Sequence, residues 1–494
     1  KTNEISTFRH ENNNPQSISD DHITCMAFGT SGDLMIGTTK GIDLYSRTGR
    51  FSHMTQGRRN HSLNTDYVNN IYVDKGGTIW VSTLVGGINK LSPKEIDITD
   101  IFSVEEGKTN VISCSFEDKD GNILVGILGK GLGIKYKSDG EEKIFSLKDN
   151  AGVSQEDIFT ILQDKDGDFW FGTRYDGFIH MSGSTLDKPS FRVYSTRNSG
   201  ISDDHIFDMV YDDERHGIWF CSSDSIYYFD IESKTSEKVR LSLVEGDYQP
   251  SRFHCLYVDK EGRLWAGGYG LCIIDISEFN HDLPCKTTFY RHLGTNVNED
   301  LERINSITQT DDGVIFVGSN SNGFYQMLPD GTCRNWPLTN SLAENSLPAR
   351  ISKIIPDEDG NLWVGAVTGV FHANRATGNL VRFTTYDGFP SHNCYINSGN
   401  RMSGNRIAFG TSNGLIIIQS PYTSIEDHVR KVHITNVITS RGMEIWSGAD
   451  GIDIYPGESS FEIDFSAMEM DDADRIWYAY RLDEISSDYT YTTS

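Results

Sequence analysis

Basic residues are scarce in this sequence of 494 residues, and their shortage excludes two classes of partner. The chain has 44 lysines and arginines against 70 aspartates and glutamates, which gives a formal net charge of −26. Nucleic acid and anionic membranes bind proteins through basic patches, which such a chain lacks. No segment reaches the roughly 18 apolar residues of a membrane-spanning helix. We therefore expect no nucleic-acid partner, and membrane attachment only through a helix outside this sequence.

Proline is also scarce, whereas glycine is abundant. There are 12 prolines and 47 glycines, and aromatic residues make up 11% of the chain. Many glycines with few prolines indicate frequent tight turns and no proline-rich linkers. The aromatic content argues against an acidic disordered tail. The sequence begins at Lys1 without a signal peptide, so we expect a processed product or a fragment.

The eight cysteines form no C-x-x-C pair, which argues against zinc and thioredoxin-like sites. Cys25, Cys114 and Cys255 fall at one equivalent place in a repeated unit. A thiol that recurs at one strand position is typical of a small apolar core residue. We expect these three side chains to be buried.

A unit of about 46 residues recurs along most of the chain. Each copy has an apolar strand, a turn with Asp and Gly, a second apolar strand with a large residue, often Trp, and a glycine-containing loop. The nine turn glycines are Gly32, Gly77, Gly121, Gly167, Gly217, Gly262, Gly313, Gly360 and Gly404. This length and these hairpin turns are typical of a four-stranded propeller blade. A helical solenoid is the rival architecture, and the strand content argues against it.

The repeat stops near residue 425. Segments at residues 433–437 and 460–467 then alternate between apolar and polar residues, as exposed-face strands do, and 477–482 looks like a third strand. They indicate the start of a small β-sandwich.

The pattern D-x-D-G-x-x-W-x-G-T at residues 164–173 resembles the two-component regulator propeller repeat. The tail from Phe461 to Leu482, which contains the run Tyr-Ala-Tyr-Arg-Leu, resembles the triple-tyrosine domain that follows such repeats. Together they are similar to the periplasmic sensor region of hybrid two-component systems of gut Bacteroidetes. The resemblance implies that the whole protein has two seven-bladed propellers, a β-sandwich, a membrane helix, a histidine kinase, a receiver and a DNA-binding domain.

Counted back from the tail, the nine copies predict three domains in an all-β fold. Residues 1–99 would hold the last two blades of a truncated first propeller, and residues 100–425 a seven-bladed β-propeller. Residues 426–494 would be the start of a triple-tyrosine-like β-sandwich. The resemblance implies a periplasmic location, and we expect a homodimer whose signal needs the kinase.

The aspartates of the turns have the spacing with which a calcium loop begins, as at Asp164, Asp166 and Asp168. A calcium loop of the EF-hand type needs a glutamate at its twelfth position, which here is Tyr175. The turns also resemble the Asp-box of sialidases, which is a structural hairpin. We interpret them as plain hairpin turns and expect no metal and no cofactor.

Basic residues recur just before the inner strands of four neighbouring units. They are His205, Arg252, Arg303 and Arg350. In a propeller the inner strands line the central channel, so these side chains could converge on its mouth, where an arginine fork suits a carboxylate or a sulfate. The alternative is that each arginine pairs with a local acid such as Glu299, Asp300 or Glu302.

The loops after the Trp strand should open onto the same face. They include Arg174, Tyr175, Tyr269 and Asn320. Aromatic, amide and charged groups together suit a sugar, because rings stack on its apolar face and polar groups bind its hydroxyls. The alternative is that these are ordinary solvated loops.

Three functions follow as hypotheses. The first is a periplasmic sensor that binds an oligosaccharide, favoured to be acidic or sulfated, and signals to a kinase. The second is a secreted propeller lyase or glycoside hydrolase, although no G-x-S-x-G, H-E-x-x-H or phosphate-binding motif is present and we assign no catalytic residues. The third is a protein-interaction propeller without a small ligand.

Overall fold

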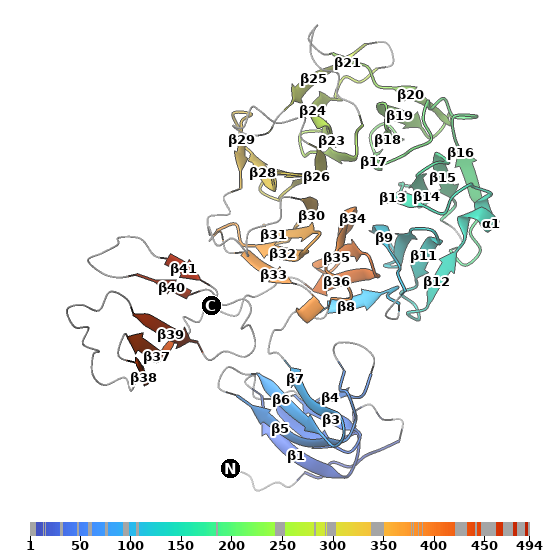
Figure 1. Ribbon diagram of the computed structural model, residues 1–494. Coiled ribbons are helices and arrows are strands. Elements are labelled where there is room, and N and C mark those ends of the chain that lie inside the picture. The colour runs from blue at the N-terminus through green and yellow to red at the C-terminus, as the bar shows by residue number, and fades with distance from the viewer. Residues whose placement is uncertain are drawn as a thin grey trace. The chain divides into compact units, whose positions relative to one another are not determined.

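The fold is all-β, as the computed structural model shows (Figure 1). The structure describes residues 6–12, 14, 16–29, 33–46, 49–57, 62–74, 78–91, 98–104, 108–183, 186–242, 252–280, 283–291, 293, 303–336, 350–376, 378, 380–383, 385–387, 389–419, 432–439, 442–445, 461–467, 478–481 and 490–492. In these residues, regular structure other than strands is limited to α1 (Leu147–Ala151) and the short 3-10 turn η1 (Thr385–Asp387). None of the helices described is long and apolar enough to cross a membrane.

The chain divides into two compact units, of which the larger runs from Ile96 to Tyr422. It contains seven antiparallel sheets, each with four main strands. The first three sheets are β9 (Ile112–Glu117), β10 (Ile123–Ile127), β11 (Gly131–Lys135) and β12 (Glu142–Phe145); β13 (Ile158–Gln163), β14 (Phe169–Thr173), β15 (Phe178–Met181) and β16 (Phe191–Tyr194); and β17 (Asp208–Asp212), β18 (Gly217–Cys221), β19 (Ile226–Asp230) and β20 (Thr235–Lys238). The fourth sheet is β22 (Cys255–Val258), β23 (Arg263–Gly268), β24 (Gly270–Asp275) and β25 (Cys285–Tyr290), and the short β21 (Leu241–Ser242) pairs parallel to β25. The last three are β26 (Ile304–Gln309), β27 (Ile315–Ser319), β28 (Phe324–Met327) and β29 (Cys333–Asn335); β30 (Ile351–Pro356), β31 (Leu362–Ala366), β32 (Gly369–Ala373) and β33 (Leu380–Phe383); and β34 (Cys394–Met402), β35 (Arg406–Thr411), β36 (Leu415–Gln419) and β8 (Ile98–Ile101).

The seven sheets form a closed ring with their first strands innermost (Figure 1). Each inner strand contacts the next, and β34 contacts β9, which completes the circle. The outer strand of the last sheet is β8, which precedes the first sheet in sequence and pairs antiparallel with β36, Ile98 opposite Ile418. The prediction of an all-β fold with four-stranded antiparallel blades is therefore confirmed.

The domain limits drawn from the repeat stay predictions. In the structure, the strand that closes the ring begins at Ile98, ahead of the first repeat of this unit. The repeated pattern does not mark this strand, because it contributes only the last strand of a blade.

The aspartate that opens each turn has a structural role. Oδ1 of Asp164 accepts hydrogen bonds from the backbone N–H groups of Asp166 (3.0 Å) and Asp168 (2.9 Å), and Oδ2 accepts one from the indole of Trp170 (2.8 Å). The same indole bond occurs in three other units, between Trp80 and Asp74, Trp219 and Asp212, and Trp265 and Asp259. This network satisfies a buried carboxylate and supports the hairpin interpretation of the turns.

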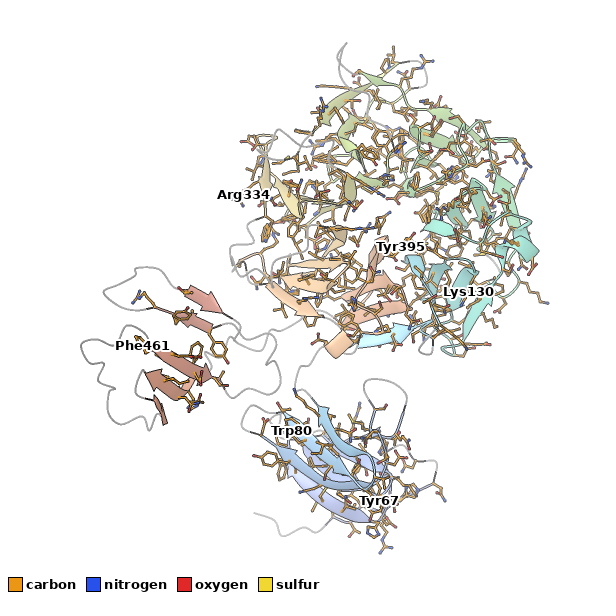
Figure 2. All side chains as sticks on the ribbon, in the orientation of Figure 1. Tyr67, Trp80, Lys130, Arg334, Tyr395 and Phe461 are labelled. Atoms are coloured by element: carbon orange, nitrogen blue, oxygen red, sulfur yellow. The ribbon has the colours of Figure 1, made fainter. Side chains whose placement is uncertain are left out.

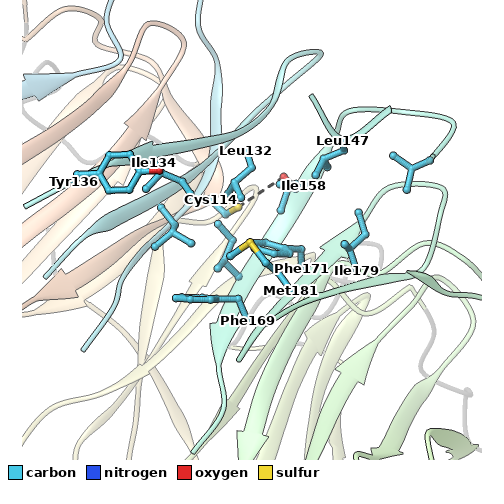
Figure 3. Close-up of a cluster of buried hydrophobic side chains, with 13 residues drawn as sticks. Cys114, Leu132, Ile134, Tyr136, Leu147, Ile158, Phe169, Phe171, Ile179 and Met181 are labelled. Atoms are coloured by element: carbon cyan, nitrogen blue, oxygen red, sulfur yellow. Dashed lines mark hydrogen bonds between the residues drawn. The ribbon is translucent and has the colours of Figure 1, made fainter. Parts of the chain in front are cut away.

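The core consists of separate apolar clusters between neighbouring sheets. One of them, drawn in Figure 3, joins the first two sheets of the ring and includes Cys114, Leu132, Ile158 and Phe171. The expected burial is confirmed for Cys114 and Cys255, and it raises the pKa of both thiols to about 12. Cys25 is half-buried against another cluster.

The smaller unit consists of residues 1–95 and 423–494. Its first part has a four-stranded sheet and a three-stranded sheet, which pack through an apolar cluster. The strands are β1 (Ile23–Phe28), β2 (Leu34–Thr38), β3 (Gly41–Tyr45) and β4 (Phe51–Met54), and β5 (Val68–Val73), β6 (Ile79–Thr83) and β7 (Gly87–Leu91).

The second part of this unit has a sheet of three strands and a pair of strands. They are β37 (His433–Thr439), β38 (Gly442–Ile445) and β39 (Glu462–Ser466), and β40 (Tyr478–Tyr480) with β41 (Thr490–Thr492). The rings of Phe465 and Tyr478 lie 5.0 Å apart, and the Tyr478 hydroxyl accepts a hydrogen bond from the Ala467 N–H group (3.0 Å). Strands occur in all three segments where the alternating pattern predicted them, and their assembly into a β-sandwich stays a prediction.

Candidate ligand site at the mouth of the ring

The end of the ring where the seven inner strands begin is called the mouth here. The eight residues predicted to bind a ligand lie there, either just before an inner strand or in the turn between the second and third strands of a sheet. Seven of them form two groups and Arg350 stays apart, and a set of side chains that the sequence did not single out connects the groups.

β-Bulges shape the mouth. In β9, β13, β26 and β30 the second residue of the inner strand is unpaired, which leaves Ser113, Phe159, Asn305 and Ser352 without a partner across the sheet. In β34 the bulge is longer and runs from residue 395 to 398. A bulge turns its side chain out of the regular alternation of the strand and is common at binding sites.

One position of the repeat therefore forms an inner circle of seven side chains. The circle consists of Ser113, Phe159, Phe207, His254, Asn305, Ser352 and Tyr395. Phe207, His254, Asn305 and Ser352 each lie two residues after one of the four basic residues that the sequence marked. Phe207 and His254 precede regular inner strands, and the other five lie in bulges. Figure 2 places Tyr395 at the centre of the ring. Three neighbouring members, Phe159, Phe207 and His254, are aromatic, whereas Asn305, Ser352 and Ser113 are buried small or amide side chains with Tyr395 between the two serines.

The aromatic members contact one another in sequence. The rings of Phe159 and Phe207 stack at 5.9 Å, and the ring of Phe207 meets that of His254 at 5.1 Å. His254 in turn lies 6.3 Å from Tyr269. Burial raises the pKa of Tyr395, whose hydroxyl also experiences the charge of Arg174.

The first group of predicted residues is built around Tyr175. Its ring lies 4.9 Å from that of His205 and 5.1 Å from the guanidinium carbon of Arg174. Arg174 also pairs with Asp157 (3.6 Å), and His205 Nδ1 shares a hydrogen bond with Asp203 (2.7 Å). Arg174 and His205 thus each pair with a nearby carboxylate, as expected if they have a structural role.

The second group is built around Arg303. The guanidinium carbon of Arg252 lies 5.8 Å from the ring centre of Tyr269, and Tyr269 forms an isolated β-bridge with Arg303. The Asn320 N–H group donates to the Arg303 carbonyl (2.9 Å). Asn305 adds its amide, which donates to Asn320 Oδ1 at 3.4 Å. Four predicted residues are thereby brought together.

The charge of the second group is not neutralised. In the part of the chain that the structure describes, Arg252, Arg303 and Arg350 form no ion pair. Nε of Arg303 and Oδ1 of Asn305 are buried without a hydrogen-bond partner. Burial, with the positive charges of Arg303 and Arg252, lowers the pKa of His254 to about 4. The candidate partners at residues 299, 300 and 302 lie outside the described residues.

Arg350 stays apart from both groups. It is exposed, and no hydrogen bond, ion pair or ring contact within the described residues joins it to another predicted side chain. Its charge acts on Tyr395, which also experiences Arg174 and Asp157. The four basic residues thus do not form one single cluster.

A set of polar side chains follows the inner circle by one residue along the inner strands; it includes Thr160, Asp208 and Lys353. Asp208 accepts hydrogen bonds from the Thr160 hydroxyl (3.2 Å) and the Leu256 N–H group (2.9 Å), so it joins three successive inner strands. Lys353 Nζ donates to Asn397 Oδ1 at 2.6 Å. Burial raises the pKa of Asp208, and the charge of Lys353 opposes this effect. The sequence analysis missed this set and the inner circle, although the repeat register could have shown both.

Comparison with known proteins identifies the repeats. A model of the two component regulator propeller family matches residues 62–84, 152–175 and 247–270. The chain carries two-component regulator propeller repeats. Two of the matched segments include Arg174 with Tyr175 and Arg252 with Tyr269, so each group at the mouth has two residues in a matched segment.

A curated relative is similar to much of the chain. Histidine kinase P4 of Formosa agariphila is 23% identical over 404 residues, which cover 76% of this chain and 28% of that protein. The chain therefore spans little more than a quarter of the length of this relative.

Solved structures share the fold. The extracellular domain assigned to a hybrid two-component system, BT3049, of B. thetaiotaomicron matches with a TM-score of 0.65 and 20% identity, over 95% of this chain and 62% of that one. Virginiamycin B lyase of Staphylococcus aureus matches with a TM-score of 0.50 and 12% identity, over 66% of this chain and 100% of the lyase. Identities this low establish a shared fold and leave function open.

Proposed function

We propose that the chain is part of the periplasmic, ligand-sensing region of a hybrid histidine kinase and response regulator. The regulator propeller repeats support this assignment, as do the relatives that are a histidine kinase and the extracellular domain assigned to a hybrid system. The ligand would be an oligosaccharide from polysaccharide degradation. The kinase would be intracellular and would lie outside this sequence.

The second group at the mouth carries the ligand proposal. Within the described residues neither Arg252 nor Arg303 forms an ion pair, and the Arg252 guanidinium lies beside the ring of Tyr269, whose backbone is bridged to Arg303. Such a group suits a sugar with a carboxylate or sulfate group, because the ring covers its apolar face and the arginines bind its oxygens. Binding must favour one of two states of the receptor, otherwise no signal results. We propose that the two states differ in the pairing of two copies of the protein.

Calorimetric titration with neutral, uronate-containing and sulfated oligosaccharides tests the ligand class. We expect heat with an acidic member, and a loss of affinity of about tenfold or more in Arg303→Gln, since a hydrogen bond to a charged group contributes about 1.5–3 kcal/mol. Arg334→Gln is the matched control, because Arg334 lies on the outer strand β29 and bonds only Gln326 there (Figure 2). Equal binding by both variants would contradict the site.

A propeller enzyme is the second candidate, because a lyase shares the fold. Asp157 is the acid to test, since it lies at the mouth and is paired with Arg174. Turnover of a polysaccharide that is lost in Asp157→Asn would favour an enzyme over a sensor. Binding without turnover favours the sensor.

A further inference from the structure

His254 experiences the charges of two arginines, Arg252 and Arg303. Its backbone N–H group donates to the Gly267 carbonyl (2.7 Å), which fixes the residue at the start of the inner strand. Phe207 covers one side of its imidazole at 5.1 Å, and Tyr269 lies at 6.3 Å. Within the described residues neither ring nitrogen has a hydrogen-bond partner.

Tyr269 connects His254 with both arginines: its ring lies 6.3 Å from that of His254 and 5.8 Å from the guanidinium carbon of Arg252, and its backbone is bridged to Arg303 of the next sheet. Arg252 adopts a left-handed backbone conformation (φ +55°), which is unfavourable for a residue with a long side chain and is common at functional sites. It is held there by a hydrogen bond from its N–H group to the Ser223 carbonyl (3.0 Å). Arg303 contributes a buried Nε–H group without an acceptor, next to the bulged Asn305.

We propose that Arg252, His254 and Arg303 form a subsite for one carboxylate or sulfate group of the ligand, and that His254 binds this group as the imidazolium. The proposal deepens the ligand site described above and rests on it for its place at the mouth. It adds that anion binding and protonation of His254 favour each other.

The electrostatics of the mouth explain the coupling. Without an anion, burial and the two guanidinium charges disfavour the imidazolium, and the pKa of His254 is about 4. The other groups that face it are Tyr269, the ring of Phe207 and, beyond Phe207, His205 at 6.4 Å from that ring. None of these described groups is an acid, and the described acid Asp208, next to Phe207, is bonded to the Leu256 N–H group. A bound anion would therefore add a negative charge where the two arginine charges now act. By linkage, the anion must then bind more tightly as the pH falls.

Histidine NMR on the whole chain tests the proposal directly. The protein is labelled with ¹³C at the imidazole carbons, and the His254 signal is identified by its absence in His254→Phe. Its pKa is measured in sodium chloride, in sodium sulfate and in sodium glucuronate at equal ionic strength. We expect a pKa of about 4 in chloride and a rise of at least about one unit in sulfate or glucuronate, which corresponds to tenfold tighter anion binding by the imidazolium.

The variants separate this subsite from a general salt effect. Arg303→Gln should raise the pKa of His254 in chloride and abolish the response to the anion, whereas Arg334→Gln should leave both unchanged. A response to sulfate alone or to glucuronate alone would define which anion the subsite takes. A His254 pKa that neither anion moves would overturn the proposal, while the calorimetric test of glycan binding would be unaffected by that result.

Discussion

At the scale of single residues, the Trp–Asp pair explains why the repeat needs both residues. We predict that Trp170→Phe lowers the free energy of unfolding by about 1–3 kcal/mol, because it leaves a buried oxygen of Asp164 without its indole donor. Urea denaturation followed by circular dichroism measures the change.

The matched control is Trp336→Phe. The indole of Trp336 packs on Phe316 and Phe324 at ring distances of 5.5 and 5.7 Å and has no aspartate partner among the described residues. Trp336→Phe should therefore lower the free energy of unfolding by less than Trp170→Phe does. Equal losses would mean that the size of the ring, and not its hydrogen bond, stabilises the blade.

The site could be predicted in part from the sequence. The repeat register placed Arg252, Arg303, Tyr269 and Asn320 at one end of adjoining blades, and the structure brings these four together. The repeat register aligns the inner-circle residues but does not show how their side chains are oriented. Five of them lie in bulges, which alternation along a strand does not reveal, and Phe207 and His254 precede their strands. Whether these residues bind a ligand stays a prediction.

At the scale of the strand, the glycine of the W-x-G-T pattern lies where one blade packs against the chain that leads into the next blade. A Cβ atom on Gly172 of β14 would lie 2.6 Å from Cγ2 of Thr160 and 2.7 Å from Cγ2 of Ile206. A Cβ atom on Gly267 would likewise come too close to Ile304, and one on Gly318 would come too close to Ile351. The glycine therefore allows the residue that leads into each next inner strand to pack closely.

We predict that Gly172→Ala lowers the free energy of unfolding by about 1–3 kcal/mol, because the added methyl group overfills this contact. Ile206→Ala alone should cost about 2–5 kcal/mol through the cavity that it leaves. In the double variant the two changes should partly compensate, so its loss should be smaller than the sum. Strict additivity in urea denaturation would show that the two side chains do not share the contact.

Most strands were predictable because their signal is local. The turn glycines located the first two strands of every blade, since a hairpin and its apolar flanks lie within a few residues of each other. The strand β8 was not predictable in this way, because its partner β36 lies at the far end of the ring in sequence. The four-residue bulge in β34 was not predictable either, because it interrupts the alternation of residues by which a strand is recognised in a sequence.

At the scale of the whole molecule, β8 joins the first and last sheets of the ring. Ile101 at its end is 1% exposed and packs in a cluster with residues of the first and last sheets. We predict that Ile101→Ala lowers the stability of the ring by about 2–5 kcal/mol. Hydrogen exchange should show reduced protection in the inner strands of all seven sheets, since each inner strand depends on its neighbours.

The control for this prediction is Ile42→Ala. Ile42 is 2% exposed and belongs to the smaller unit, so its replacement should leave protection in the ring unchanged. If Ile101→Ala reduced protection only in the last sheet, the blades would be independent units and the ring would not be cooperative.

The antiparallel pairing of β8 with β36 has a mechanical consequence. Ile98 lies opposite Ile418, so the chain enters the ring and leaves it at the same end of this strand pair. Tension between the two flanking segments would therefore break the hydrogen bonds of the pair one after another, starting at that end. It would not load them all at once, as a shearing force does. A pull through the backbone would thus open the last blade at low force, before the other six are strained.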